Sequence, residues 1–129
     1  MEKVSFVTTV KNDAAGTQML FASLLQQQRL PDEVVVVDAC STDGTHKVLE
    51  DFEKKYKSHG IAYKIIRKAC NRAAGRNMAI QAAAHTIIAV SDAGCVLQHN
   101  WLKKICTPFT DKKIDVVAGF YKGAYKSYF

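Results

Sequence analysis

Several features that mark special classes of protein are absent from this sequence of 129 residues. No apolar run is long enough to cross a membrane, and even the stretch from Ala82 to Val90 is interrupted by His85 and Thr86. Strand-like sequence begins within a few residues of Met1, so the apolar core of a secretory signal peptide is missing. These absences lead us to expect a cytoplasmic protein.

Metal-binding and redox motifs built from cysteine are also missing. The four cysteines form no CxxC pair; they are Cys40, Cys70, Cys95 and Cys106. Without such a pair, a zinc knuckle or a thioredoxin-like motif has no support. We interpret these residues as small buried thiols.

Two common phosphate-binding loops are absent as well. The sequence contains neither GxGxxG nor GxxxxGK[ST], which excludes the dinucleotide fingerprint and the Walker loop. Eighteen basic residues exceed twelve acidic ones and give a net charge of +6, but the lysines are spread along the chain. We therefore expect no nucleic-acid partner and interpret most lysines as a solvated face. Attraction to a polyphosphate ligand or to an anionic membrane surface is the alternative.

The residues that are present fit one globular domain. Hydrophobic residues make up 48% of the chain, which is enough for a packed core and too much for a disordered protein. Strands are predicted over residues 4–10, 33–38, 62–67, 86–91 and 115–118. Helices are predicted over residues 17–28, from a cap at 41–43 to residue 57, and over 74–84 and 101–106. This alternation predicts an α/β fold with an open, mostly parallel sheet and helices on both faces.

Polar loops follow the strands of this predicted sheet. Because the carboxyl ends of parallel strands meet at one edge, loops 8–13, 38–45, 67–77 and 91–95 should converge on a ligand crevice. In the second loop, Asp38 can accept hydrogen bonds from a base N–H or a ribose hydroxyl. The alternative is an ordinary strand-to-helix turn, which also uses Asp, Ser, Thr and Gly.

The last two loops contain groups suited to metal and phosphate. Asp92 follows a predicted strand, and Mg²⁺ or Mn²⁺ is commonly held by one or two carboxylates together with substrate phosphates. Arg76 and Asn77 lie near a helix start, where a guanidinium and backbone N–H groups suit a diphosphate. As alternatives, Asp92 could cap the following helix and Arg76 could be a surface charge.

Taken in order, four segments resemble family 2 glycosyltransferases of the GT-A fold. The similarity lies in VSFV with Asn12-Asp13, VVVD with STDGT, GRN with Ile80 and Ala83, and SDAGC with Trp101-Leu102. These segments are similar to the family's first strand and turn, its VVDDGSTDGT segment, its ARNxGI helix and its DxD region. The resemblance covers nearly the whole chain and implies the nucleotide-sugar-binding half of a GT-A, Rossmann-like fold.

The resemblance also implies roles for individual residues. It places Thr9 and Asp38 at the nucleoside, with Asp38 pairing with the base, and Asp13 at the position of a family glutamate in the donor site. Arg76 would lie near the diphosphate, and Asp92 would bind Mg²⁺ or Mn²⁺. The implied reaction is an inverting, metal-assisted transfer of a sugar from a nucleoside diphosphate, with UDP-sugars as the leading donors.

The sequence departs from the family pattern within the site and at the chain's end. Ala39 stands where many members have a second aspartate, and Gly94 stands where the DxD motif has its second carboxylate. Family members generally continue for about as long again and supply the acceptor site and the catalytic base there. Asp111 and Asp115 are the only acids after Asp92, and neither lies in a motif of that kind. The catalytic base is therefore unassigned.

We expect residues 1–129 to form a single nucleotide-sugar-binding domain that lacks the C-terminal acceptor-binding half. Its partners would be a UDP-sugar or related donor and a saccharide or lipid-linked acceptor, in polysaccharide or glycolipid synthesis. Peripheral association with the inner membrane face fits such an acceptor. The alternative is a non-catalytic nucleotide-binding or self-assembling module that forms homo-oligomers through an exposed sheet edge.

Overall fold

The centre of the molecule is a parallel sheet. In the computed structural model, which describes residues 2–120, the strands lie in the order β3-β2-β1-β4 and all pairs are parallel. The strand bounds are Val4–Val10 (β1), Glu33–Asp38 (β2), Ala62–Arg67 (β3) and Ile87–Val90 (β4). This arrangement confirms the predicted α/β fold with an open sheet.

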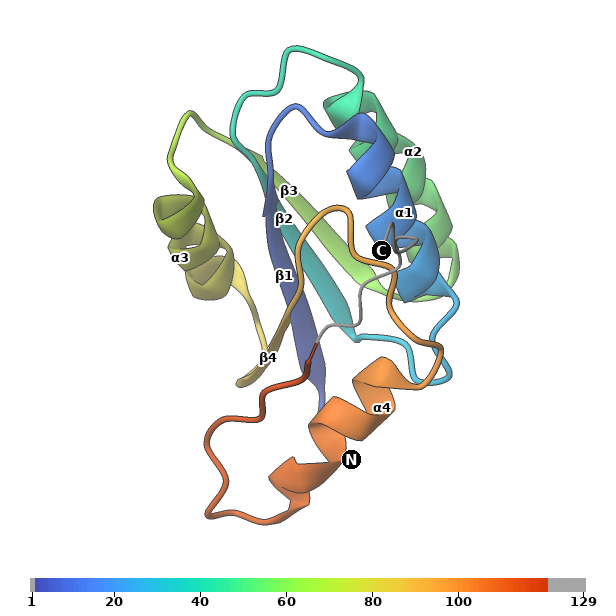
Figure 1. Cartoon of the computed structure of the whole chain (residues 1–129), viewed down its shortest axis with the longest axis vertical. Coiled ribbons are helices and arrows are strands. Elements are labelled where there is room, and N and C mark those ends of the chain that lie inside the picture. Colours follow the sequence, from blue (N-terminus) through green and yellow to red (C-terminus); the bar gives the residue numbers. More distant parts are fainter. Residues whose placement is uncertain (1, 121–129) are drawn as a thin grey trace, which may run out of the picture.

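Helices cover both faces of this sheet. Their bounds are Ala14–Leu25 (α1), Thr45–Ser58 (α2), Arg72–Ala82 (α3) and Trp101–Cys106 (α4), followed by a 3₁₀ helix at Thr107–Thr110 (η1). Figure 1 shows α1 and α2 on one face, α3 on the other, and α4 near the amino ends of the strands. No helix within residues 2–120 combines the length and the apolar character that a membrane span requires.

The run of four valines in β2 forms the middle of the structure. Val34 and Val36 belong to the core between the sheet and α1–α2, whereas Val35 and Val37 belong to the smaller core under α3. All four side chains are completely buried. A strand covered on both faces has no solvent side and can be continuously apolar, as the sequence predicted.

Aromatic side chains join α1, α2 and β3 in the larger core. Phe21 packs against Phe52 and Tyr56, with ring centroids 5.8 and 6.0 Å apart. The Tyr56 hydroxyl donates to the Phe21 carbonyl at 2.7 Å, and the Tyr63 hydroxyl donates to the Leu49 carbonyl at 2.9 Å. Burial raises the pKa of both tyrosines, so the phenols stay neutral donors that hold the two helices over the sheet.

The predicted fifth strand at residues 115–118 is wrong. In the described part of the chain this segment pairs with no strand, and Val116 is 82% exposed. Consecutive β-branched residues fit a pleated, half-buried surface, but they form a strand only where a neighbouring strand supplies hydrogen bonds. Here the segment follows η1 and forms no ladder with any of the four strands.

The interpretation of the cysteines as buried thiols holds for one of the four. Cys106 in α4 is buried, and burial raises the pKa of its thiol. Cys40, Cys70 and Cys95 are only partly buried, which corrects the expectation for them. The reason is their location, since each lies in a loop beyond the carboxyl end of a strand.

Candidate functional site

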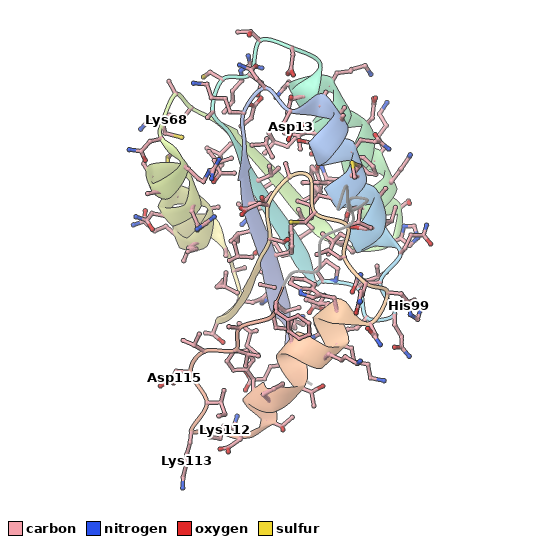
Figure 2. All side chains as sticks on the ribbon, viewed as in Figure 1. Asp13, Lys68, His99, Lys112, Lys113 and Asp115 are labelled. Atoms are coloured by element: carbon pink, nitrogen blue, oxygen red, sulfur yellow. The ribbon has the colours of Figure 1, made fainter. Side chains whose placement is uncertain are left out.

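A cavity of about 440 Å³ lies at the carboxyl ends of the strands. All four loops predicted to converge there contribute to its lining, which consists of Thr9, Val10, Lys11, Asp13, Ala39, Cys70, Asn71, Arg72, Asp92 and Ala93. Figure 2 shows Asp13 and Lys68 at this end of the molecule, far from Lys112 and Lys113 at the other. A cavity therefore lies where the ligand crevice was predicted, and Thr9, Asp13 and Asp92 of the predicted site residues line it, whereas Asp38 and Arg76 do not.

The loops that form the cavity use unusual backbone conformations. Asn12 and Cys40 have φ angles of 47° and 59°, in the left-handed region that non-glycine residues rarely adopt. They lie directly after β1 and β2, and Gly94, after β4, has a φ of 92°. Such strained positions persist only where surrounding contacts fix them, and they cluster at functional sites.

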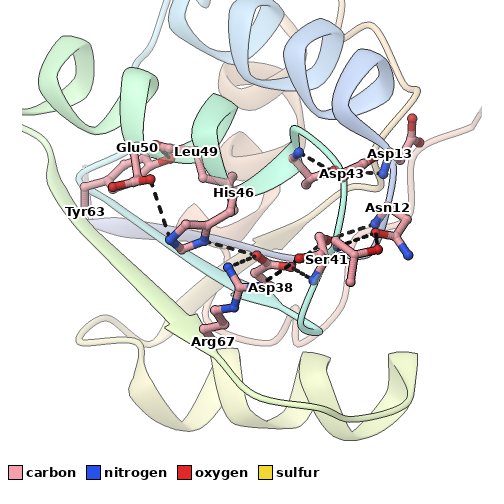
Figure 3. A network of polar contacts seen from close by, with 12 residues as sticks. Asn12, Asp13, Asp38, Ser41, Asp43, His46, Leu49, Glu50, Tyr63 and Arg67 are labelled. Carbon is pink, nitrogen blue, oxygen red and sulfur yellow. Dashed lines mark hydrogen bonds and ion pairs between the residues drawn. The ribbon is translucent and has the colours of Figure 1, made fainter.

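Hydrogen bonds fix the first two loops to each other (Figure 3). The Asn12 N–H donates to Ser41 Oγ at 2.9 Å, and the Thr42 N–H donates to Asn12 Oδ1 at 2.7 Å. The Asp13 N–H donates to Thr45 Oγ1 at 2.9 Å. Because these bonds run in both directions, the loops after β1 and β2 form one rigid wall of the cavity.

Asp38 anchors this wall from below. Its side chain is 0% exposed, and its Oδ1 accepts from the Ser41 N–H at 2.9 Å and from Ser41 Oγ at 2.6 Å. Its Oδ2 faces His46 Nδ1 at 3.1 Å and Arg67 Nη1 at 3.8 Å. Asp38 itself does not line the cavity, whereas its neighbour Ala39 does. The carboxylate thus orders the loop beside the ligand space, and its Oδ2 lies on the side of the two basic groups.

Two further carboxylates accept hydrogen bonds near the starts of helices in this wall. Asp13 Oδ1 accepts from the Gly16 N–H at 2.9 Å, which starts α1 earlier than the predicted residue 17. Asp43 Oδ1 accepts from the N–H and hydroxyl of Thr45, at 2.9 and 2.6 Å. These bonds from Thr45 hold the pKa of the Asp43 carboxyl below its usual value. Asp13 is therefore both a lining residue and a structural cap.

Thr9 lies on the side of the cavity next to α3. Its hydroxyl oxygen is buried and has no hydrogen-bond partner among the described residues. Gly75 allows the close approach, since a Cβ at that position would lie 2.5 Å from Thr9 Cγ2. Thr9 thus lines the cavity as a residue, while its hydroxyl oxygen is close to Gly75, 2.9 Å from where a Cβ at that position would lie.

Arg76 and Asp92 form an ion pair beside the cavity. Arg76 Nη2 donates to Asp92 Oδ1 at 3.1 Å, and the two side chains are 39% and 48% exposed. Arg76 and Asn77, which were predicted to suit a diphosphate, are both absent from the residues that line the cavity. Arg76, which was predicted to lie near the diphosphate, is therefore in direct contact with Asp92, which was predicted to bind the metal.

A divalent cation has limited protein ligands at this place. The described residues contain no group of three or more His, Cys, Asp or Glu side chains arranged to hold a metal. Asp92 is a hard oxygen donor that is half exposed, and one carboxylate can suffice for Mg²⁺ or Mn²⁺ when substrate phosphates complete the shell. The residues thus fit a metal that is bound jointly with a phosphate ligand.

Sequence reasoning missed several residues of this region. Asn71 caps α3, with its Oδ1 accepting from the Ala74 N–H at 2.8 Å, and its position before an alanine-rich run was a readable signal. For His46 and Arg67, the sequence contains no pattern that predicts a contact with Asp38. Their contacts with Asp38 depend on the orientation of α2 and on the pairing of Asp38 with Arg67 across β2 and β3.

Comparisons with known proteins agree with this geometry. Residues 5–129 match the sequence profile of the family described as Glycosyl transferase family 2. The glycosyltransferase AglE of Haloferax volcanii is 27% identical over 118 residues, which cover 90% of this chain and 38% of that relative. The glycosyltransferase TuaG of Bacillus subtilis is 30% identical over 101 residues, which cover 78% of this chain and 39% of that relative.

Solved structures show the same architecture. S. aureus TarS 1–349 in complex with UDP-GlcNAc has a TM-score of 0.69 and 28% identity, covering 85% of this chain and 31% of that one. The mannosyltransferase PcManGT from Pyrobaculum calidifontis, in complex with GDP-Man and Mn²⁺, has a TM-score of 0.65 and 25% identity, covering 74% and 28%. The chain spans less than two fifths of the curated relatives it matches. It belongs to glycosyl transferase family 2.

Proposed function

We propose that this family 2 glycosyltransferase domain binds a nucleoside diphosphate sugar, with UDP as the preferred nucleotide, in the cavity at the carboxyl ends of its strands. The observation on which this rests is the convergence of all four strand-end loops on one cavity of about 440 Å³. Parallel α/β sheets bind ligands at this edge. TarS, which shares the fold, was solved with UDP and with UDP-GlcNAc.

The residues in and beside the cavity divide between the parts of such a donor. Thr9 and Asp38 would contact the nucleoside: Thr9 lines the cavity and its hydroxyl has no partner among the described residues, and Asp38 directly precedes Ala39, which lines the cavity. Asp13 would hold the loop around the donor through its cap on α1. Arg76 would neutralise the diphosphate, and Asp92 would bind Mg²⁺ or Mn²⁺ together with it. When bound, such a cation stabilises the negative charge that develops on the departing diphosphate.

The third loop supplies a favourable electrostatic field for this donor. Arg72 is exposed at the amino end of α3, and Arg67 ends the preceding strand. The amino end of a helix attracts phosphate through its free N–H groups and its dipole. Together with the net charge of +6, this arrangement favours a ligand with two or more negative charges.

The transfer step needs more than the cavity offers. Inverting transfer requires a base that removes the acceptor's proton while the diphosphate leaves on the opposite side. Asp13 and Asp92 line the cavity, but the first caps α1 and the second pairs with Arg76. We infer that the chain binds donor without completing transfer, and that the base and the acceptor site are supplied elsewhere in the working enzyme.

The acceptor we propose is a saccharide or a lipid-linked saccharide, in the synthesis of a polysaccharide or glycolipid. A lipid-linked acceptor would bring the protein to the inner face of the membrane from the cytoplasm. The net charge of +6 supports such peripheral attraction, since anionic lipid surfaces attract basic proteins.

A non-catalytic self-assembling module is the second candidate function. In the described residues, β4 pairs only with β1, so its other edge forms no strand pairing and is where a second copy could add a strand. A concentration-dependent dimer in analytical ultracentrifugation, without any affinity for nucleoside diphosphates, would favour this candidate over donor binding.

Titration calorimetry tests the donor proposal directly. We expect UDP to bind in the presence of Mn²⁺ or Mg²⁺ with a Kd between roughly 1 μM and 1 mM, the usual range for enzyme substrates. GDP and dTDP serve as comparisons for the base. The proposal fails if no nucleoside diphosphate gives heat, with or without metal. Measurable sugar transfer by the isolated chain would contradict the inference that it lacks the base.

A further inference from the structure

The ion pair between Arg76 and Asp92 uses the carboxylate that is proposed above as the metal ligand. Arg76 Nη2 lies 3.1 Å from Asp92 Oδ1, close enough for a charge-assisted hydrogen bond. The pair connects α3 to the loop after β4, two segments 16 residues apart in the sequence. The guanidinium of Arg76 therefore already compensates the negative charge of Asp92.

The backbone around Asp92 explains why one cation is enough. Gly94 has a φ of 92°, which side-chain-bearing residues rarely adopt, although no atom would obstruct a Cβ there. The loop is held in this shape by the Gly94 N–H, which donates to the Gly16 carbonyl at 2.9 Å, and by the Cys95 N–H, which donates to the Asp92 carbonyl at 3.1 Å. This turn favours glycine at position 94, where the DxD motif has its second carboxylate. Asp92 is therefore the one carboxylate of the motif here, and a single guanidinium can neutralise it.

Arg76 also has unused capacity for a second anion. Its Nε is buried and has no hydrogen-bond partner among residues 2–120. A guanidinium offers five N–H donors in a fixed fork, and only one of them is used toward Asp92. A diphosphate offers more negative charge and more acceptor oxygens than one carboxylate, so it competes well for this side chain.

We infer that Arg76 is a latch that keeps divalent cations off Asp92 until a diphosphate draws the guanidinium away, so that nucleotide binds before metal. The inference rests on the proposed donor site, because the diphosphate is the anion that releases the latch. It predicts that the metal alone binds weakly and that nucleotide and metal strengthen each other's binding.

The binding of Mn²⁺ alone, measured by the loss of the free-ion electron paramagnetic resonance signal, tests the latch. Arg76→Gln should bind Mn²⁺ about fivefold more tightly than the wild type, the size expected for a half-exposed ion pair. The gain should vanish in the double variant Arg76→Gln with Asp92→Asn. Arg76→Lys preserves the charge and should stay near the wild type.

A matched control separates the latch from general electrostatics. Lys68 is an exposed cation in the loop before α3 and forms no ion pair among the described residues. Lys68→Gln removes the same charge and should change Mn²⁺ affinity by less than about twofold, because solvent and salt screen exposed charges. If Arg76→Gln and Lys68→Gln raise Mn²⁺ affinity equally, or if neither does, the latch is overturned.

The nucleotide titration distinguishes this failure from failure of the proposed function. With UDP present, we expect the wild type to bind Mn²⁺ several-fold more tightly than without it, and Arg76→Gln to lose most of this difference. UDP binding that is unaffected by metal, with no gain in Arg76→Gln, overturns the latch and leaves the donor site standing. Absence of UDP binding under every condition overturns the donor site itself.

Discussion

Glu33 and Asp38 lie at opposite ends of the same strand, β2, and both are buried carboxylates. Their side chains are 2% and 0% exposed. Each accepts a short hydrogen bond from a serine hydroxyl, Ser5 at 2.7 Å for Glu33 and Ser41 at 2.6 Å for Asp38. One strand therefore places a carboxylate at its amino end and another at its carboxyl end. The two carboxylates differ in the residues that surround them.

The partners of Glu33 all belong to the scaffold. Ser5 lies on β1, the Ala84 N–H donates to Glu33 Oε1 at 2.7 Å just after α3, and Lys64 on β3 lies 3.0 Å from Oε2. Burial alone raises the pKa of the Glu33 carboxyl, but the bonds from Ala84, Ser5 and Lys64 together hold it below its usual value. Glu33 thus joins the sheet to the end of α3.

The partners of Asp38 belong to the loop and helix beside the cavity. Ser41 lies in the loop, His46 lies on α2, and the cation on β3 is at the longer distance of 3.8 Å. His46 Nε2 in turn lies 3.8 Å from Glu50 Oε1 (Figure 3). The comparison indicates that a buried carboxylate joins parts of the scaffold at the amino end and orders the loop beside the cavity at the carboxyl end.

Removing the amino-end carboxylate should have the largest effect on stability. Glu33→Ala leaves the Ser5 hydroxyl and the Ala84 N–H without their acceptor, so the free energy of unfolding in urea should fall by about 2 to 4 kcal/mol. UDP affinity should change by less than about twofold at a temperature where the variant is folded. Glu53→Ala, which breaks only the partly exposed pair with Lys57, is the control and should cost less than about 0.5 kcal/mol.

Neutralising the carboxyl-end carboxylate should mainly affect binding. Asp38→Asn keeps the shape of the side chain but removes the negative charge of the carboxylate that we propose accepts a hydrogen bond from the base. Calorimetry should therefore show UDP affinity weakened about tenfold or more. The loss of unfolding free energy should be smaller than for Glu33→Ala. Equal UDP affinity in Asp38→Asn and the wild type would break the proposed division between the two ends.

The pH dependence of stability should report on Glu33. Because its folded pKa is lowered, its stabilisation is fully present above its ordinary pKa of about 4.5 and is lost as the pH falls through the folded value. The difference in unfolding free energy between the wild type and Glu33→Gln should therefore narrow between pH 6 and acid pH. A difference that stays constant or widens in acid contradicts this account.

Substitutions of Lys64 and Arg67, the two cations of β3, should have the smallest effects. One should affect stability and the other UDP binding. Lys64→Met should cost about 0.5 kcal/mol of stability, since half of its side chain is in solvent, and should leave UDP binding unchanged. Arg67→Met also removes the donor to the Ser41 carbonyl at 2.9 Å and should weaken UDP binding about threefold. The reverse pattern would show that the carboxyl end is structural as well.

The sequence was sufficient for the strands, the parallel sheet and the four converging loops, because those depend on local patterns. The valine run predicted strand β2 correctly, and all four loops expected to converge contribute to the lining of the cavity. The Val116-Val117 pair led to the wrong prediction of a strand at residues 115–118, since β-propensity says nothing about whether a partner strand is near. The contacts of Asp38 with His46 and of Arg76 with Asp92 could not be predicted, because they depend on how helices pack on the sheet.

Nuclear magnetic resonance titration of the labelled chain with UDP and Mg²⁺ tests the central claim most directly. The account predicts that amide shifts concentrate in the loops that line the cavity, around Lys11, Ala39, Asn71 and Ala93, and stay near zero around Glu33. No shifts at saturating UDP, or shifts concentrated at the amino ends of the strands, would contradict it.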